Sequence, residues 1–139
     1  MKWRLIDESL PGFENYKTIE FNYWFANGQH TTTGVNYSGT SRRAFLPASD
    51  EGKIVFKMLV EAFNRRLTFV VGTSLTTGQT NTVVWAGIHH KTSFAGGPFG
   101  YPDDKYLGRV TEELKARDID ADSVKDLKVD FLKGLINLK

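Results

Sequence analysis

The chain has no cysteine among its 139 residues, and this absence removes most of the devices that hold small domains together. Disulfide frameworks, zinc fingers, RING-type zinc folds, iron–sulfur clusters and thiol nucleophiles all require cysteine. A chain of this length must instead fold around a hydrophobic core, and it has room for one such core. Its hydrophobic content of 40% and charged content of 24% are those of an ordinary globular domain.

The sequence contains no apolar run long enough to cross a membrane. Asp7 and Glu8 interrupt the region where a signal peptide would need its apolar segment. The lack of cysteine is compatible with a reducing compartment, and we expect an intracellular protein, cytoplasmic or nuclear. The net charge of +2 is too small to indicate nucleic-acid binding, although Arg42–Arg43 and Arg65–Arg66 are either phosphate-attracting pairs or solvated surface arginines.

Strands and helices are predicted without a regular alternation, which is typical of an α+β fold. Residues 18–25 and 68–71 are rich in β-branched and aromatic side chains and predict strands, and 80–92 is most simply a strand too. The segment 26–41 predicts a hairpin or long loop, with a possible short strand at 35–37.

Three helices are predicted from apolar residues spaced three and four apart. The first covers about 51–66, and the second starts near Asp103 or Asp104 and carries Leu107, Val110 and Leu114 on one face. The third covers about 122–138 and docks on its own domain or on a partner, although Gly134 within it weakens a helix by about 1 kcal/mol.

Four features could carry chemistry. The turn 72–78 has two glycines and four hydroxyl groups, so it is either a plain hairpin turn or a loop that binds phosphate or ribose oxygens. His89 and His90 are adjacent on a predicted strand and point to opposite faces, which argues against a metal site; each is either structural or a ligand-binding imidazole. Glu113, at the margin of a helical stripe, is either a surface residue or a half-buried base. The loop 97–102, with Phe99 and Tyr101, is either a lid over a pocket or a plug in the core.

Several short motifs occur in an order that resembles the Deltex C-terminal (DTC) domain family, over roughly Ser9 to Leu114. The motifs are Ser9–Glu14 (SLPGFE), Phe45–Pro47 (FLP), Asn64–Leu67 (NRRL), Thr68–Ser74 (TFVVGTS), Thr76–Gly78 (TTG), Thr82–Trp85 (TVVW), Ile88–Thr92 (IHHKT), Gly100–Asp103 (GYPD) and Tyr106–Leu107. The resemblance implies one α+β domain over 1–139, with a bent mixed or antiparallel sheet and two to three packed helices. It also implies a pocket for ADP-ribose and NAD, with no metal and no required cofactor.

The resemblance also implies roles for individual residues. The residues of the implied pocket wall are Thr73, Ser74, Leu75, Thr76 and Thr77. His89 would face the ligand, Tyr101 would be a neighbouring aromatic, and Glu113 matches a family acid that helps to activate a ribose hydroxyl. In Deltex ubiquitin ligases the domain follows a RING and presents ADP-ribose, or an ADP-ribosylated target, for joining to ubiquitin.

Three departures from the family pattern change these expectations. Phe99 stands where the ligases usually carry a catalytic histidine, and loss of a general base typically lowers a rate by about 10²–10⁴-fold. Leu75 replaces a hydroxyl residue, and Ser93 replaces a glutamate. No RING can form without cysteine, and the first motif lies close to Met1, so we expect a freestanding domain.

We therefore predict a non-catalytic module that binds ADP-ribose, NAD or a related adenine nucleotide, free or on an ADP-ribosylated macromolecule, with Phe99 covering the base. The alternative is an enzyme: a ubiquitin-transfer domain of E3-ligase type that works with a separate RING partner, or an ADP-ribose hydrolase, with Glu113 as base. A third possibility is single-stranded nucleic-acid binding through Arg42, Arg43, Arg65 and Arg66.

Overall fold

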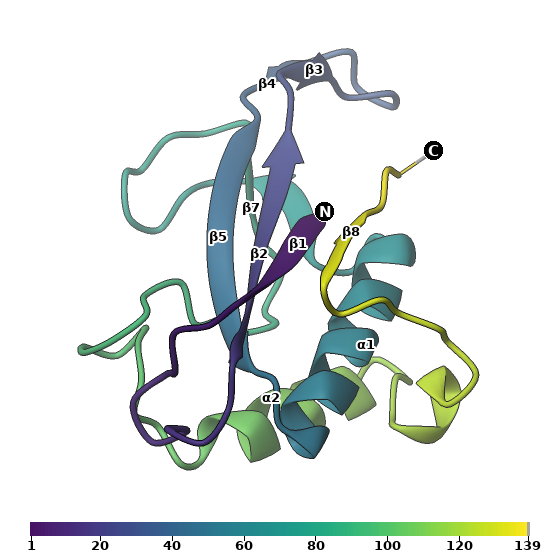
Figure 1. Ribbon diagram of the computed structural model, residues 1–139. Coiled ribbons are helices and arrows are strands. Elements are labelled where there is room, and N and C mark those ends of the chain that lie inside the picture. The colour runs from purple at the N-terminus through teal and green to yellow at the C-terminus, as the bar shows by residue number, and fades with distance from the viewer. Residues whose placement is uncertain (139) are drawn as a thin grey trace.

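The computed structural model describes residues 1–138 as one α+β domain, which confirms the predicted class (Figure 1). Its main sheet has four antiparallel strands in the order β5-β2-β1-β8. Their bounds are β1 (Lys2–Ile6), β2 (Thr18–Phe25), β5 (Thr40–Pro47) and β8 (Lys133–Leu135). Two further strand pairs are β3 (Gly28–Gln29) with β4 (Asn36–Tyr37), and β6 (Phe69–Gly72) with β7 (Thr82–Trp85). The helices are α1 (Asp50–Asn64), α2 (Tyr106–Lys115) and the 3₁₀ turn η1 (Asp122–Val124).

Helix α1 covers one face of the main sheet and builds the core with it (Figure 1). Ser49 caps the helix, because its hydroxyl accepts a hydrogen bond from the N–H of Gly52 at 3.1 Å. Phe56 of α1 meets Phe21 and Trp3 of the sheet edge-to-face, with ring centroids 5.4 and 5.3 Å apart. Alternate residues of β2 point into this core, so the predicted strand 18–25 is confirmed at its stated bounds.

The predicted strand 80–92 is wrong beyond Trp85, where β7 ends. Gly87 adopts a positive φ of 98°, which turns the chain out of the strand. The N–H of His89 then bonds the side chain of Glu113 rather than a neighbouring strand. Residues 86–92 therefore run as irregular chain between β7 and the loop that carries Phe99.

The predicted C-terminal helix over 122–138 is also wrong, because only Asp122–Val124 is helical and the chain then extends into β8. In Figure 1 this yellow segment runs beside β1. Gly134 lies against the indole of Trp3, where an added Cβ would come within 2.0 Å of a ring carbon. Trp3 Nε1 donates to the carbonyl of Asp130 at 2.8 Å, and the terminal amine of Met1 donates to that of Ile136 at 2.8 Å. The tail thus packs on its own domain, as strand rather than helix.

None of the helices in residues 1–138 is long and apolar enough to span a bilayer.

Candidate functional site

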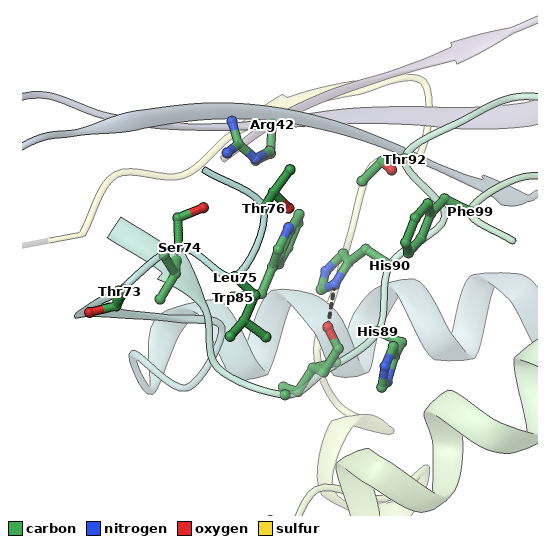
Figure 2. Close-up of a pocket in the computed structure, with 13 residues that line it drawn as sticks. Arg42, Thr73, Ser74, Leu75, Thr76, Trp85, His89, His90, Thr92 and Phe99 are labelled. Carbon is green, nitrogen blue, oxygen red and sulfur yellow. Dashed lines mark hydrogen bonds between the residues drawn. The ribbon is translucent and has the colours of Figure 1, made fainter. Parts of the chain in front are cut away.

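A cavity of about 700 Å³ opens beside β5 and β7, a size typical of small-molecule sites (Figure 2). It brings together the β6–β7 turn, the end of β7, the two histidines and the loop with Phe99. Its lining residues are Arg42, Thr73, Ser74, Leu75, Thr76, Val84, Trp85, Gly87, Ile88, His89, His90, Thr92 and Phe99.

The β6–β7 turn supplies four of the five turn residues predicted for the site. Thr73, Ser74, Leu75 and Thr76 line the cavity, whereas Thr77 lies outside the lining. Ser74 organises the turn: its carbonyl accepts from Gly78 N–H at 2.9 Å and its hydroxyl accepts from Thr77 N–H at 3.2 Å. Leu75 is fully exposed, so its side chain is open to any molecule that enters from solvent.

An aromatic stack forms the inner wall of the cavity. Trp85 stacks on Phe69 with ring centroids 4.5 Å apart, and on His90 with centroids 4.4 Å apart. The Nδ1 atom of His90 donates to the carbonyl of Ile88 at 2.8 Å, so Nε2 accepts from the hydroxyl of Tyr23 at 2.8 Å. Burial lowers the pKa of His90 to about 4. His90 is therefore a neutral ring with both nitrogens occupied, and it offers a ligand its face only.

His89 is held differently, by residues of α2. The carboxylate of Glu113 accepts from the main-chain N–H of His89 at 2.9 Å and also pairs with its ring Nδ1. The hydroxyl of Tyr106 donates to the carbonyl of His89 at 2.7 Å. Because a carboxylate only accepts, Nδ1 carries a proton, and in the neutral ring Nε2 is left as a lone pair. The ring is 65% exposed, and Nε2 has no partner among residues 1–138.

Phe99 lines the cavity from the loop 93–102, and a buried lysine fixes that loop. Lys91, with 3% of its side chain exposed, donates to the carbonyl of Pro98 at 3.0 Å and to the carboxylate of Asp103 at 2.8 Å. Arg109 also reaches Asp103, at 3.0 Å, and these two cations hold the pKa of that carboxyl far below its usual range. In Figure 2 the ring of His90 lies between those of Trp85 and Phe99.

Tyr101, expected beside the ligand, is instead buried in the core and does not line the cavity. Its hydroxyl donates to the carbonyl of Phe45 at 2.8 Å, and burial raises its pKa far above the usual range. The two aromatic residues of the loop therefore have different places: Tyr101 packs in the core, and Phe99 lines the cavity.

Sequence reasoning missed Arg42, Trp85, His90 and Thr92 as wall residues. Trp85, His90 and Thr92 belong to the VVW and IHHKT motifs, so their place in the motifs was the available signal. Arg42 and Arg43 are adjacent on β5 and point to opposite faces, and only Arg42 reaches the cavity. Arg65 lies at the end of α1, where it pairs with Glu61, so the four arginines do not form one nucleic-acid surface.

Among residues 1–138, no three His, Asp or Glu side chains gather as a metal-binding group. The cavity thus combines one cation, a hydroxyl-rich turn, an aromatic wall and one free imidazole nitrogen.

Comparison with known proteins identifies the family of this chain. The family model "Deltex C-terminal domain" matches residues 1–119. A probable E3 ubiquitin-protein ligase DTX3 from Homo sapiens is 50% identical over an alignment of 119 residues that covers 81% of this chain and 34% of the relative. E3 ubiquitin-protein ligase DTX4 from Mus musculus is 43% identical over an alignment of 131 residues that covers 88% of this chain and 21% of the relative.

E3 ubiquitin-protein ligase DTX1 from Homo sapiens is 41% identical over an alignment of 127 residues that covers 86% of this chain and 20% of the relative. The chain thus spans between about a fifth and a third of the length of these relatives. The family-model match covers most of the chain and includes every motif that carries the resemblance. The chain belongs to the Deltex C-terminal domain family.

Proposed function

We propose that this domain binds ADP-ribose, or a related adenine nucleotide such as NAD, and is not itself a catalyst. The observation that carries the proposal is the convergence of Arg42, the hydroxyl-rich turn and the Trp85–His90 stack on one cavity. Its volume of about 700 Å³ lies within the range of small-molecule sites.

The diphosphate is assigned to the side of the cavity with Arg42 and the β6–β7 turn. A guanidinium matches phosphate oxygens with paired donors. Ser74 and Thr76 add hydroxyl donors on the same wall, and the glycines at both ends of the turn let its backbone come close to a ligand. No acidic side chain lines the cavity within residues 1–138, and Glu113 beside it is engaged by His89, on the side away from the proposed diphosphate position.

The ribose and base are assigned to the histidine side. The Nε2 lone pair of His89 can accept a hydrogen bond from a ribose hydroxyl. The outer face of His90 and the ring of Phe99 give apolar surfaces that suit a flat purine, whereas Phe69 and His90 cover the two faces of Trp85.

Phe99 supports a binding role rather than catalysis. Its ring can neither accept a proton nor orient a nucleophile, so a ribose hydroxyl beside it is not activated. Free ADP-ribose and an ADP-ribosylated macromolecule are both candidate ligands, since both carry the same nucleotide group.

Calorimetry with ADP-ribose, AMP and NAD tests the proposal, with Arg42→Gln and Arg43→Gln as matched variants. We expect binding of ADP-ribose that Arg42→Gln weakens and Arg43→Gln leaves unchanged, because these neighbours lie on opposite faces of β5. Absence of heat from the unmodified protein at ligand concentrations of about 1 mM would refute nucleotide binding.

A second candidate, ubiquitin transfer with a separate RING partner, is favoured by the contact between Glu113 and His89. In that reaction a ribose hydroxyl oxygen attacks the thioester between ubiquitin and a conjugating enzyme. The C–O ester bond forms, the C–S bond breaks and the thiolate leaves, while the hydroxyl proton passes to Nε2 of His89. Glu113, expected from the sequence to be the base, has both oxygens engaged by His89 and would orient that ring instead.

A gel assay with ADP-ribose, activating and conjugating enzymes, ubiquitin and a RING protein tests this candidate. A ubiquitin–ADP-ribose product that Glu113→Gln removes would overturn the non-catalytic proposal.

A further inference from the structure

The face of the main sheet turned away from α1 carries an unusual set of side chains. Strand register places residues directly opposite one another on the same face. Lys2 is opposite both Asn22 and Leu135, and Asn22 is opposite Arg43. In the next row, Arg4 is opposite both Glu20 and Lys133. We call this surface the basic sheet face; its members are Lys2, Arg4, Arg43, Lys133, Trp24 and Leu135.

The exposed charges on the basic sheet face are all positive. All four of its cationic side chains are exposed, whereas the acid among them, Glu20, is mostly buried and already paired with Arg4 at 3.2 Å. Arg4 and Lys133 stand directly opposite each other on neighbouring strands, an arrangement of like charges that destabilises a sheet. Glu20 neutralises Arg4 but not Lys133, so a carboxylate supplied from outside would reduce this repulsion further.

Two large apolar side chains lie on the same face as the cations. Trp24 is 70% exposed and Leu135 is 65% exposed. Tryptophan and arginine are the residues that most often dominate binding at protein interfaces. Cations flanked by exposed apolar side chains fit a partner that supplies both carboxylates and apolar groups.

We propose that the basic sheet face is a docking surface for an acidic polypeptide segment with apolar residues interspersed. A second copy of this chain would bring the same cations together and is disfavoured by repulsion. Sheets that bind single-stranded nucleic acid stack bases on two or three aromatic rings. On this face of the described sheet Trp24 is the exposed aromatic, while Phe45 is 4% exposed and packed under Phe94.

The docking surface is independent of the nucleotide cavity. Arg43 belongs to the basic sheet face and its neighbour Arg42 to the cavity on the other side of β5. The two proposals therefore succeed or fail separately.

The test measures fluorescence anisotropy of a labelled synthetic peptide, rich in glutamate with leucine and phenylalanine at intervals, against a peptide with glutamine in place of glutamate. We expect the glutamate peptide to bind and the glutamine peptide not to bind. Lys133→Glu is the decisive variant, because it removes a docking cation and places a carboxylate opposite Arg4. It should weaken peptide binding by about tenfold while leaving the unfolding temperature equal or higher.

Arg42→Glu is the control and should leave peptide binding unchanged. Amide chemical shifts that move on β1, β2 and β8 when the peptide is added would support the site without any substitution. The proposal is overturned if the glutamate peptide does not bind at low salt, or if Lys133→Glu binds it as well as the unmodified chain. Tighter binding of oligothymidylate or of phosphatidylserine vesicles than of the peptide would also overturn it, by assigning the face to another partner.

Discussion

Glu113 holds His89 at two points, accepting from its main-chain N–H at 2.9 Å and pairing with its ring Nδ1. One carboxylate thus fixes both the position of the backbone and the tautomer of the ring. This is how an acid orients a histidine in hydrolase triads, where the second ring nitrogen is left free to act on a substrate.

Glu113→Gln should invert the tautomer of His89. Glutamine has one acceptor oxygen, so when this oxygen keeps the His89 N–H, its NH₂ group faces Nδ1 and favours a proton on Nε2. Long-range ¹H–¹⁵N spectra of the neutral ring would report the change. Loss of the Nε2 acceptor should weaken ADP-ribose binding by about fivefold, equivalent to about 1 kcal/mol for one hydrogen bond. A ring that keeps its proton on Nδ1 in the variant would contradict this assignment.

His89→Ala should weaken ADP-ribose binding at least as much as Glu113→Gln does, whereas Phe99→His should preserve it. The first change removes the free imidazole nitrogen, while the second keeps a flat ring at the mouth of the cavity. Calorimetry on both variants measures the difference, with thermal unfolding to show that each is folded. Equal affinities for the two variants would place the ligand elsewhere.

His90 should make the fold less stable as the pH falls from about 6.5 to 4. Burial lowers its pKa to about 4, so in this range the unfolded chain binds a proton that the folded chain does not. The full loss is about 3 kcal/mol, reached below pH 4. Urea unfolding of the unmodified chain and of His90→Gln, compared between pH 7.5 and 4.5, isolates this contribution. Parallel pH dependences in the two proteins would rule it out.

Asp103→Asn should destabilise the fold more than Lys91→Met does. The first change leaves the ammonium group of Lys91 buried without its anion, which typically costs about 3–5 kcal/mol. The second removes the buried charge, while Asp103 keeps Arg109 as a partner. Urea denaturation of both variants and of the double variant measures the order, and the double variant should be less unstable than the two single effects added together.

Alanine in place of Gly134 and alanine in place of Gly108 should change the stability of the fold in opposite directions. Gly134→Ala places a Cβ inside the contact between β8 and Trp3, so it should destabilise the fold by about 1–3 kcal/mol. Gly108→Ala lies in α2 with open space around it and should stabilise the fold by about 0.5–1 kcal/mol. Thermal unfolding of the pair is enough to check both signs.

The parts of the fold that follow from local pattern could be predicted from sequence. The segment 18–25 forms the expected strand, and the segment predicted as a helix over about 51–66 forms α1, whose Val55, Met58 and Leu59 face the core. The tail could not be predicted, because its apolar spacing fits a helix equally well. What decides for a strand is the distant contact between Gly134 and Trp3, together with pairing to β1.

The candidate site could likewise be predicted from the sequence only in part. The turn residues and His89 lay in or beside recognisable motifs, Glu113 matched a family acid and Phe99 departed from the family pattern. The structure places them at or beside one cavity. Arg42 depends on the register of β5, and the role of His90 depends on Tyr23, which is far away in sequence. Neither relationship leaves a local trace in a single sequence.

The stack of Phe69, Trp85 and His90 has a thermodynamic consequence for any ligand of the cavity. His90, at one end of the stack, is held by hydrogen bonds to Tyr23 and to the carbonyl of Ile88. This wall of the cavity therefore has little side-chain entropy left to lose. The exposed side chains of Leu75 and Phe99 retain theirs. Binding a flat ring on the stack should therefore cost little ordering, and the entropic penalty should grow as a ligand reaches toward the turn and the loop.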